Sequence, residues 1–190
     1  MLLILYWLIY FALHSLSASG NFKRKMQKIM GNYFRFYRLL YSFFATASLT
    51  IILWYLFSLK SLMLWNAGYF EKGFSIISIG FGLTIMLICI KKYFVYLSGV
   101  DVFIKTKSEN HLQVKGLHKF VRHPLYAGTL VFLWGLFLFN PLVSWFISAI
   151  CITIYTRIGI YFEEKKLIAE FGESYKEFAS STPMLIPRLF

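Results

Sequence analysis

The sequence predicts an all-α integral membrane protein with five transmembrane helices. The last two form a C-terminal helical hairpin, and a short interfacial C-terminal helix follows them. Of the 190 residues, 58% are hydrophobic and only 15% are charged, whereas about a quarter of a soluble domain is charged. In addition, apolar segments alternate with short basic stretches, as in chains that cross a bilayer repeatedly. We expect a single domain over residues 1–190.

Five apolar segments predict the five transmembrane helices. They run over residues 1–18, 39–59, 74–97, 125–139 and 142–162. The fourth is short, because about 15 residues rise only about 22 Å at 1.5 Å per residue. Asn140 and Pro141 turn the chain directly into the fifth segment, so we expect these two segments to form the hairpin.

The residues after the fifth segment predict an amphipathic helix rather than a sixth span. Leu167, Ile168 and Phe171 form one apolar stripe, and lysine and glutamate residues occupy the other faces. Such a helix lies on the membrane surface or covers a site. Gly172 is expected to end it.

The distribution of charge predicts the orientation in the membrane. The formal net charge is +12, but the basic residues cluster between apolar runs, which argues against a nucleic-acid partner. Six basic residues follow the first segment and five follow the third, whereas Lys60 and Lys72 follow the second. The positive-inside rule places the N-terminus outside and the C-terminus in the cytoplasm. We expect an integral protein of the bacterial inner membrane, with the lipid bilayer as its surroundings and no obligate protein partner.

Cysteine and histidine residues give no indication of a metal site. Cys89 and Cys151 lie within apolar runs, where cysteine behaves as a small core residue. The four histidines do not pair with one another or with cysteine at the spacing of a zinc site. We expect no metal.

The motif Arg122-His123-Pro124 predicts an anion-binding site. Proline is favoured at the first position of a helix, so His123 would be the N-cap of the fourth apolar helix. The backbone N–H groups of the first turn, together with Arg122 and His123, would bind a carboxylate or phosphate. Alternatively, Arg122 and His123 are interfacial residues that extend toward the headgroups. Gly128, one turn into the helix, would let another helix or a flat ring approach closely.

Glu163 and Glu164 predict a cation-binding group at the end of the fifth segment. In an antiparallel hairpin they return to the membrane face that carries His123, so one mouth would suit a zwitterionic, ring-bearing cofactor. We assign Glu163 to this role, because Glu164 is rotated about 100° away along a helix. Alternatively, both glutamates pair with Lys165 and Lys166 at the protein surface.

Together these motifs resemble a known family. The segments "HLQVKGLHKFVRHPLYAG", "NP", "EEKKLIAEFGESYKEF" and "PMLIP", over about residues 111–190, are similar to the integral-membrane methyltransferases typified by isoprenylcysteine carboxyl methyltransferase. "ALHSLSAS" and "IGIYFEEKKL" resemble a bacterial branch that includes methanethiol S-methyltransferase and a denitrification-associated membrane family.

The resemblance implies S-adenosyl-L-methionine as cofactor and assigns candidate site residues. The cofactor would contact His111, Leu112, Gln113, Val114, His118, His123, Pro124, Leu125, Tyr126 and Glu163. The candidate catalytic residues are Arg122, Tyr126 and Arg157. Two positions depart from the family: His118 replaces the usual tyrosine, and Gly159 replaces a substrate-binding arginine, so that Arg157 is the nearest one.

The resemblance implies a cytoplasmic-face membrane methyltransferase that acts on a small thiol or a lipophilic acceptor. Two alternatives remain open. Membrane sterol reductases, which use NADPH, share the pattern RHP-x-Y-x-G and a terminal Ile-Pro. A small membrane protein could also bind a lipid without catalysis.

The charge distribution leads to a testable topology. Cysteines introduced at Lys25 and Lys115 should resist an impermeant thiol reagent in intact cells, whereas one at Ser61 should react, because the positive-inside rule puts the first two in the cytoplasm. The opposite labelling pattern would contradict both the topology and a cytoplasmic site.

Overall fold

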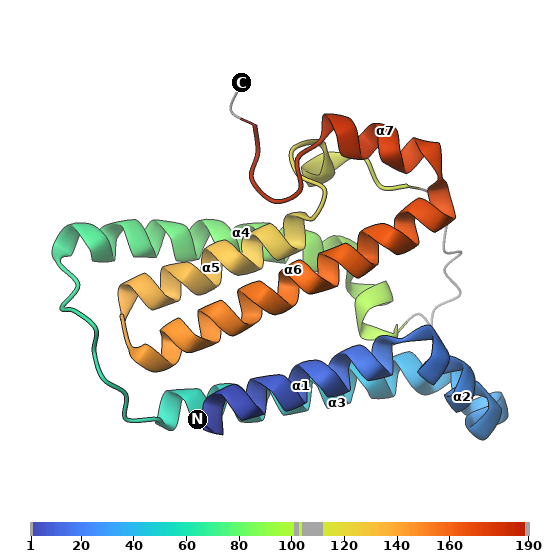
Figure 1. Ribbon diagram of the computed structural model, residues 1–190, viewed down its shortest axis with the longest axis horizontal. Coiled ribbons are helices and arrows are strands. Elements are labelled where there is room, and N and C mark those ends of the chain that lie inside the picture. The colour runs from blue at the N-terminus through green and yellow to red at the C-terminus, as the bar shows by residue number, and fades with distance from the viewer. Residues whose placement is uncertain (1, 101–102, 104–111, 189–190) are drawn as a thin grey trace. The chain divides into compact units, whose positions relative to one another are not determined.

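The computed structural model describes residues 2–100, 103 and 112–188, and these residues are predominantly helical. The prediction of an all-helical protein is confirmed over this part of the chain, in which the pair Met63–Leu142 forms a single antiparallel bridge. The elements are α1 (Leu2–Ala18), α2 (Gly20–Met30), η1 (Gly31–Phe36), α3 (Tyr37–Ser58), α4 (Tyr69–Ser98), η3 (Gly116–Lys119), α5 (Pro124–Phe139), α6 (Val143–Phe171) and α7 (Glu173–Ser181) (Figure 1).

The apolar helices identify an integral membrane protein. Three described stretches are long and apolar enough to cross a membrane, namely Gly20–Ser58, Tyr69–Lys92 and Val143–Phe171. α1 and α5 are shorter apolar helices of 17 and 16 residues. Large side chains such as Trp54 and Phe43 are mostly exposed on these helices, as expected for surfaces that face lipid. The count of five spans stays a prediction.

The chain divides into two compact units, of which the first contains residues 1–62 and 93–107. In this unit α1 packs against α3 and buries Leu3 and Trp7. Two tyrosines of α3 make polar contacts with α1. The Tyr37 hydroxyl donates to the Ser17 carbonyl over 2.7 Å, and the Tyr41 hydroxyl lies 2.7 Å from His14 Nε2. These polar contacts set the register of an otherwise apolar helix pair.

The second unit contains residues 63–92 and 108–190. Within it, α4 and α5 approach closely at glycine positions. A Cβ atom on Gly82 would lie 2.5 Å from the Phe132 backbone nitrogen, and one on Gly128 would lie 2.8 Å from Ile85. Of the two possibilities that the sequence left open for Gly128, the structure shows the approach of another helix.

α5 leads into α6 through a short connection that is tied to the rest of the unit. The Leu142 N–H donates to the Asn140 carbonyl over 2.8 Å, and the Leu64 N–H donates to the Pro141 carbonyl over 2.8 Å. α5 and α6 then pack against each other, and Trp134 Nε1 donates to the Thr153 hydroxyl over 3.1 Å. These contacts join the second half of α5 to the first half of α6.

α6 differs from the fifth predicted segment in its length. It does not end near Phe162 but continues to Phe171, where Gly172 ends it with a φ of 57°. The sequence Glu-Glu-Lys-Lys-Leu-Ile-Ala-Glu is a good helix former, so the change from apolar to charged residues does not break the helix. Glu163 and Glu164 therefore lie two turns before the end of α6. Their negative charges are not beside the negative end of the helix dipole, which would destabilise them.

Two glycines of α4 provide a matched test of the close contact with α5. Gly82→Ala should destabilise the protein by about 1–3 kcal/mol, because its Cβ would overlap the α5 backbone. Gly80→Ala should stabilise it by about 0.5–1 kcal/mol, because no atom lies within 4 Å of its Cβ position and alanine is the better helix former. Unfolding in detergent measures both, and equal effects would contradict the packing of α4 on α5.

Candidate functional site

The candidate site begins where the chain enters α5. Pro124 is the first residue of the helix, as expected, and His123 precedes it with φ −123° and ψ 67°. The His123 side chain makes no capping hydrogen bond to the first turn of α5, although the residue is buried. The positive end of the helix dipole therefore has no side-chain cap from His123.

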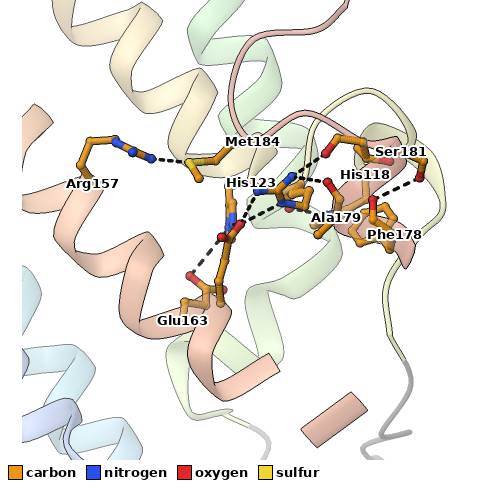
Figure 2. Close-up of polar contacts among 11 residues, drawn as sticks. His118, His123, Arg157, Glu163, Phe178, Ala179, Ser181 and Met184 are labelled. Atoms are coloured by element: carbon orange, nitrogen blue, oxygen red, sulfur yellow. Dashed lines mark hydrogen bonds and ion pairs between the residues drawn. The ribbon is translucent and has the colours of Figure 1, made fainter. Parts of the chain in front are cut away.

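Arg122 is surrounded by acceptors from this chain, among them the backbone carbonyl of Ala179, a residue that Figure 2 labels. Its Nε and Nη2 atoms both lie 2.8 Å from Glu164 Oε1. Its Nη1 atom donates to the backbone carbonyls of Ala179, over 2.9 Å, and Thr182, over 2.6 Å. The sequence motif predicts that Arg122 binds an external anion, and in the structure its three guanidinium nitrogens contact α6, α7 and the residue that follows α7.

The backbone of Arg122 and His123 also binds the residues that follow α7. The Arg122 N–H donates to the Pro183 carbonyl over 2.9 Å, and the His123 N–H donates to the Met184 carbonyl over 3.1 Å. Residues 182–184 thus run beside residues 122 and 123, just before α5 begins. We call residues 182–184 the C-terminal strap.

The imidazole of His123 lies between the two glutamates. Its Nε2 atom is 3.1 Å from Glu164 Oε1, and its Nδ1 atom is 3.9 Å from Glu163 Oε2. The Glu164 side chain is 19% exposed, whereas that of Glu163 is 44% exposed. The expectation that Glu164 turns away from this group is wrong, because its rotation along α6 directs it onto Arg122 and His123. Glu163 keeps a carboxylate that solvent or a ligand can reach.

Tyr175 of α7 belongs to the same cluster and was not predicted as a site residue. It is only 2% exposed, and its hydroxyl has no hydrogen-bond partner of good geometry within the described residues. Burial, together with the nearby Glu164 carboxylate, raises the pKa of Tyr175 to about 12. The sequence contains one indication of its burial, because Tyr175 and Phe178 continue the apolar stripe of Leu167, Ile168 and Phe171 beyond Gly172, but it indicates no polar neighbour.

His118 and Gln113 are placed by neighbours outside α5. His118 Nδ1 lies 2.9 Å from the Arg122 carbonyl oxygen, and burial lowers the pKa of His118 below its ordinary value. Gln113 accepts a hydrogen bond over 3.1 Å from Lys92 of α4. Leu112 and Val114 flank Gln113, but His111 lies outside the described residues.

Tyr126 and Arg157 lie on two sides of this group. The Tyr126 ring centroid is 5.8 Å from that of His123, with the two rings tilted by 30°. The exposed Arg157 donates to the sulfur of Met184, the residue whose carbonyl accepts from the His123 N–H. The C-terminal strap thus connects Arg157 of α6 to the start of α5.

Comparisons with known proteins identify the class. The profile of the phospholipid methyltransferase family matches residues 69–174, which is more than half of the chain. This chain therefore belongs to the phospholipid methyltransferase family, and the predicted relationship to membrane methyltransferases is confirmed.

The individual relatives are all methanethiol S-methyltransferases. Methanethiol S-methyltransferase 2 of Bradyrhizobium diazoefficiens is 41% identical over 76 residues, which cover 39% of this chain and 28% of that protein. Methanethiol S-methyltransferase 1 of the same organism is 26% identical over 92% of this chain and 62% of its own length. The Crocosphaera subtropica methanethiol S-methyltransferase is 25% identical over 92% of this chain and 69% of its own length. No solved structure matches the chain.

The unequal environments of the two glutamates lead to a stability prediction. Glu164→Gln should destabilise the protein by about 1–3 kcal/mol, because Arg122 and His123 lose their charged acceptor in a largely buried place. Glu163→Gln should change stability by less than about 0.5 kcal/mol, because its carboxylate is much more exposed. Thermal unfolding in detergent measures the difference. A larger loss for Glu163→Gln would contradict the assignment of Glu164 as the partner of Arg122.

Proposed function

We propose that this protein is an S-adenosyl-L-methionine-dependent membrane methyltransferase. It would transfer a methyl group to a small thiol or a lipophilic acceptor at the cytoplasmic membrane face. The observation that carries the proposal is the position of His123, between Glu163 and Glu164 and at the N-terminus of α5. Membership of the phospholipid methyltransferase family supports the reaction class.

The residues of this site fit the charges of the proposed cofactor. The first turn of α5, which His123 does not cap with its side chain, offers a backbone N–H donor at Leu125 for a carboxylate. The exposed carboxylate of Glu163 offers an acceptor for an ammonium group. Opposite charges in one small region match the amino-acid part of S-adenosyl-L-methionine. When bound, this cofactor supplies a methyl group on a sulfonium, which is activated for displacement.

We assign different roles to the three candidate catalytic residues. Arg122 is a positioning residue, because Glu164 and the carbonyls of Ala179 and Thr182 already occupy its donors. Tyr126, whose ring lies beside that of His123, would line the path by which the acceptor approaches the cofactor. Arg157, exposed on α6, would contact the acceptor rather than the cofactor.

Methyl transfer places modest demands on acid–base chemistry. An in-line displacement needs alignment of donor and acceptor and exclusion of water more than a general base. Burial of His123 and the fixed C-terminal strap support such alignment. A thiol acceptor must also lose its proton. Basic side chains near the site would lower the pKa of the thiol and thereby favour the thiolate.

The relatives and the composition favour particular acceptors and surroundings. Several relatives carry the name methanethiol S-methyltransferase, which makes a small thiol the first acceptor to test. The proposed arrangement is five spans with the N-terminus outside, and α5 and α6 form the hairpin that brings the site to the cytoplasmic face. The partners would then be the bilayer and the substrate, with neither nucleic acid nor an obligate protein partner. The family match supports neither the reductase nor the non-catalytic alternative.

Calorimetry on the detergent-purified protein tests the cofactor. S-adenosyl-L-methionine and S-adenosylhomocysteine should bind, and NADPH should not. Glu163→Gln should weaken binding about tenfold, because a charge-assisted hydrogen bond to the ammonium group becomes a neutral one.

The matched control is Glu170→Gln, an exposed glutamate of the same helix, which should bind as the wild type does. Binding of NADPH alone would favour the reductase. Normal binding by Glu163→Gln would refute the assignment of Glu163.

A further inference from the structure

α2 carries a concentration of positive charge that the candidate site does not use. Its basic residues Lys23, Arg24, Lys25 and Lys28 are all exposed. The first acidic residue of the whole chain is Glu71. No carboxylate side chain between residues 1 and 70 is therefore available to balance this charge locally.

α2 is a separate helix with defined ends. The Ser19 hydroxyl accepts a hydrogen bond over 3.2 Å from the Phe22 N–H at the start of the helix. At the other end, the N–H of Gly31, which has a φ of 52°, donates to the Gln27 carbonyl. Helix ends of this kind stabilise the helix. A helical backbone spaces its side chains regularly, so the charges lie on a regular surface.

The two faces of α2 differ sharply. At 100° per residue, the apolar side chains occupy a single arc, and Lys23 and Lys25 border it. This arc consists of Phe22, Met26, Ile29 and Met30. Phe22, Met26 and Met30 are partly buried within their own unit, whereas Ile29 is 67% exposed. Tyr33 of the following η1 is 71% exposed.

The place of α2 in the chain brings this amphipathic surface to the end of a pair of apolar helices. α1 ends at Ala18 and α3 begins at Tyr37, and α2 and η1 connect them within one unit. Figure 1 shows α2 at one end of the α1–α3 pair. Apolar membrane helices emerge at the headgroup layer, so α2 begins where lipid headgroups lie.

We propose that α2 binds anionic phospholipid headgroups. Lys23, Arg24, Lys25 and Lys28 contact the phosphates, while Ile29 and Tyr33 enter the boundary between headgroups and acyl chains. Charge complementarity favours this partner. The positive charges match the anionic headgroups of a bilayer, and the exposed apolar side chains beside them match the acyl chains beneath the headgroups. A free phosphate would use the charges but leave Ile29 and Tyr33 exposed to water.

The experiment uses the full chain in nanodiscs of phosphatidylcholine, with or without phosphatidylglycerol. An environment-sensitive fluorophore is attached at Ile29→Cys after Cys89→Ala and Cys151→Ala. Emission should shift to shorter wavelength when phosphatidylglycerol is present, and high salt should reverse the shift. Replacement of Lys23, Arg24, Lys25 and Lys28 by glutamine should abolish the shift.

A charge-matched control separates this surface from the total charge of the protein. Replacement of the exposed lysines 60, 72, 166 and 176 by glutamine removes the same charge and should leave the shift intact. Titration of phosphatidylglycerol into detergent micelles should show binding by the α2 variant that is weaker by at least tenfold and at most about 600-fold, because four basic residues are removed and each contributes up to about fivefold.

Three results would overturn the proposal. The first is the same emission in both lipid compositions, and the second is a shift that survives in the α2 variant. The third is an equal response to inorganic phosphate alone, which would indicate an anion site rather than a lipid surface.

Discussion

The Arg122 guanidinium is the contact on which the arrangement of the second unit depends. It joins the start of α5 to Glu164 of α6 and to the carbonyls of Ala179 and Thr182, which lie 42, 57 and 60 positions away in the sequence. A planar group with several fixed donors can serve these acceptors simultaneously, which a lysine ammonium could not do with the same geometry. The backbone pairing of residues 122 and 123 with Pro183 and Met184 extends this contact.

Because of this contact, the two adjacent glutamates have different roles. Glu164 neutralises Arg122 and contacts His123, so a largely buried cation has the partner that its desolvation requires. Glu163, one residue earlier, lies on the other side of the imidazole and keeps a more exposed carboxylate. The buried side chain of Tyr175 lies near this pair and is only 2% exposed. A rigid charged pair therefore supports a neighbouring carboxylate that remains available to a ligand, and the proposed cofactor site uses this difference.

Basic residues have two distinct physical roles in this protein. Arg122 is largely buried and paired, and it organises three segments of its own chain. The cations of α2 are exposed and lie in a stretch without acidic residues, so any carboxylate side chain that pairs with them lies outside residues 1–70. The first role is nearly independent of salt, whereas the second is screened by it. The net charge of +12 conceals this distinction, which only the positions of the side chains reveal.

The sequence alone determined the helical class, the start of α5 at Pro124, the end of α6 at Gly172 and the family, because these follow from local rules and short motifs. It also brought His123 and the glutamates to one group. Tertiary structure decided which glutamate contacts Arg122 and His123, because the rotation of α6 about its axis depends on its packing against α5 and α7. The continuation of α6 past Phe162 is again a local property, since helix propensity outweighs the change in hydrophobicity there. The partners of Arg122 and the burial of Tyr175 depend on a chain reversal after α7, and hydrophobic periodicity contains no information about contacts 50 or more residues apart.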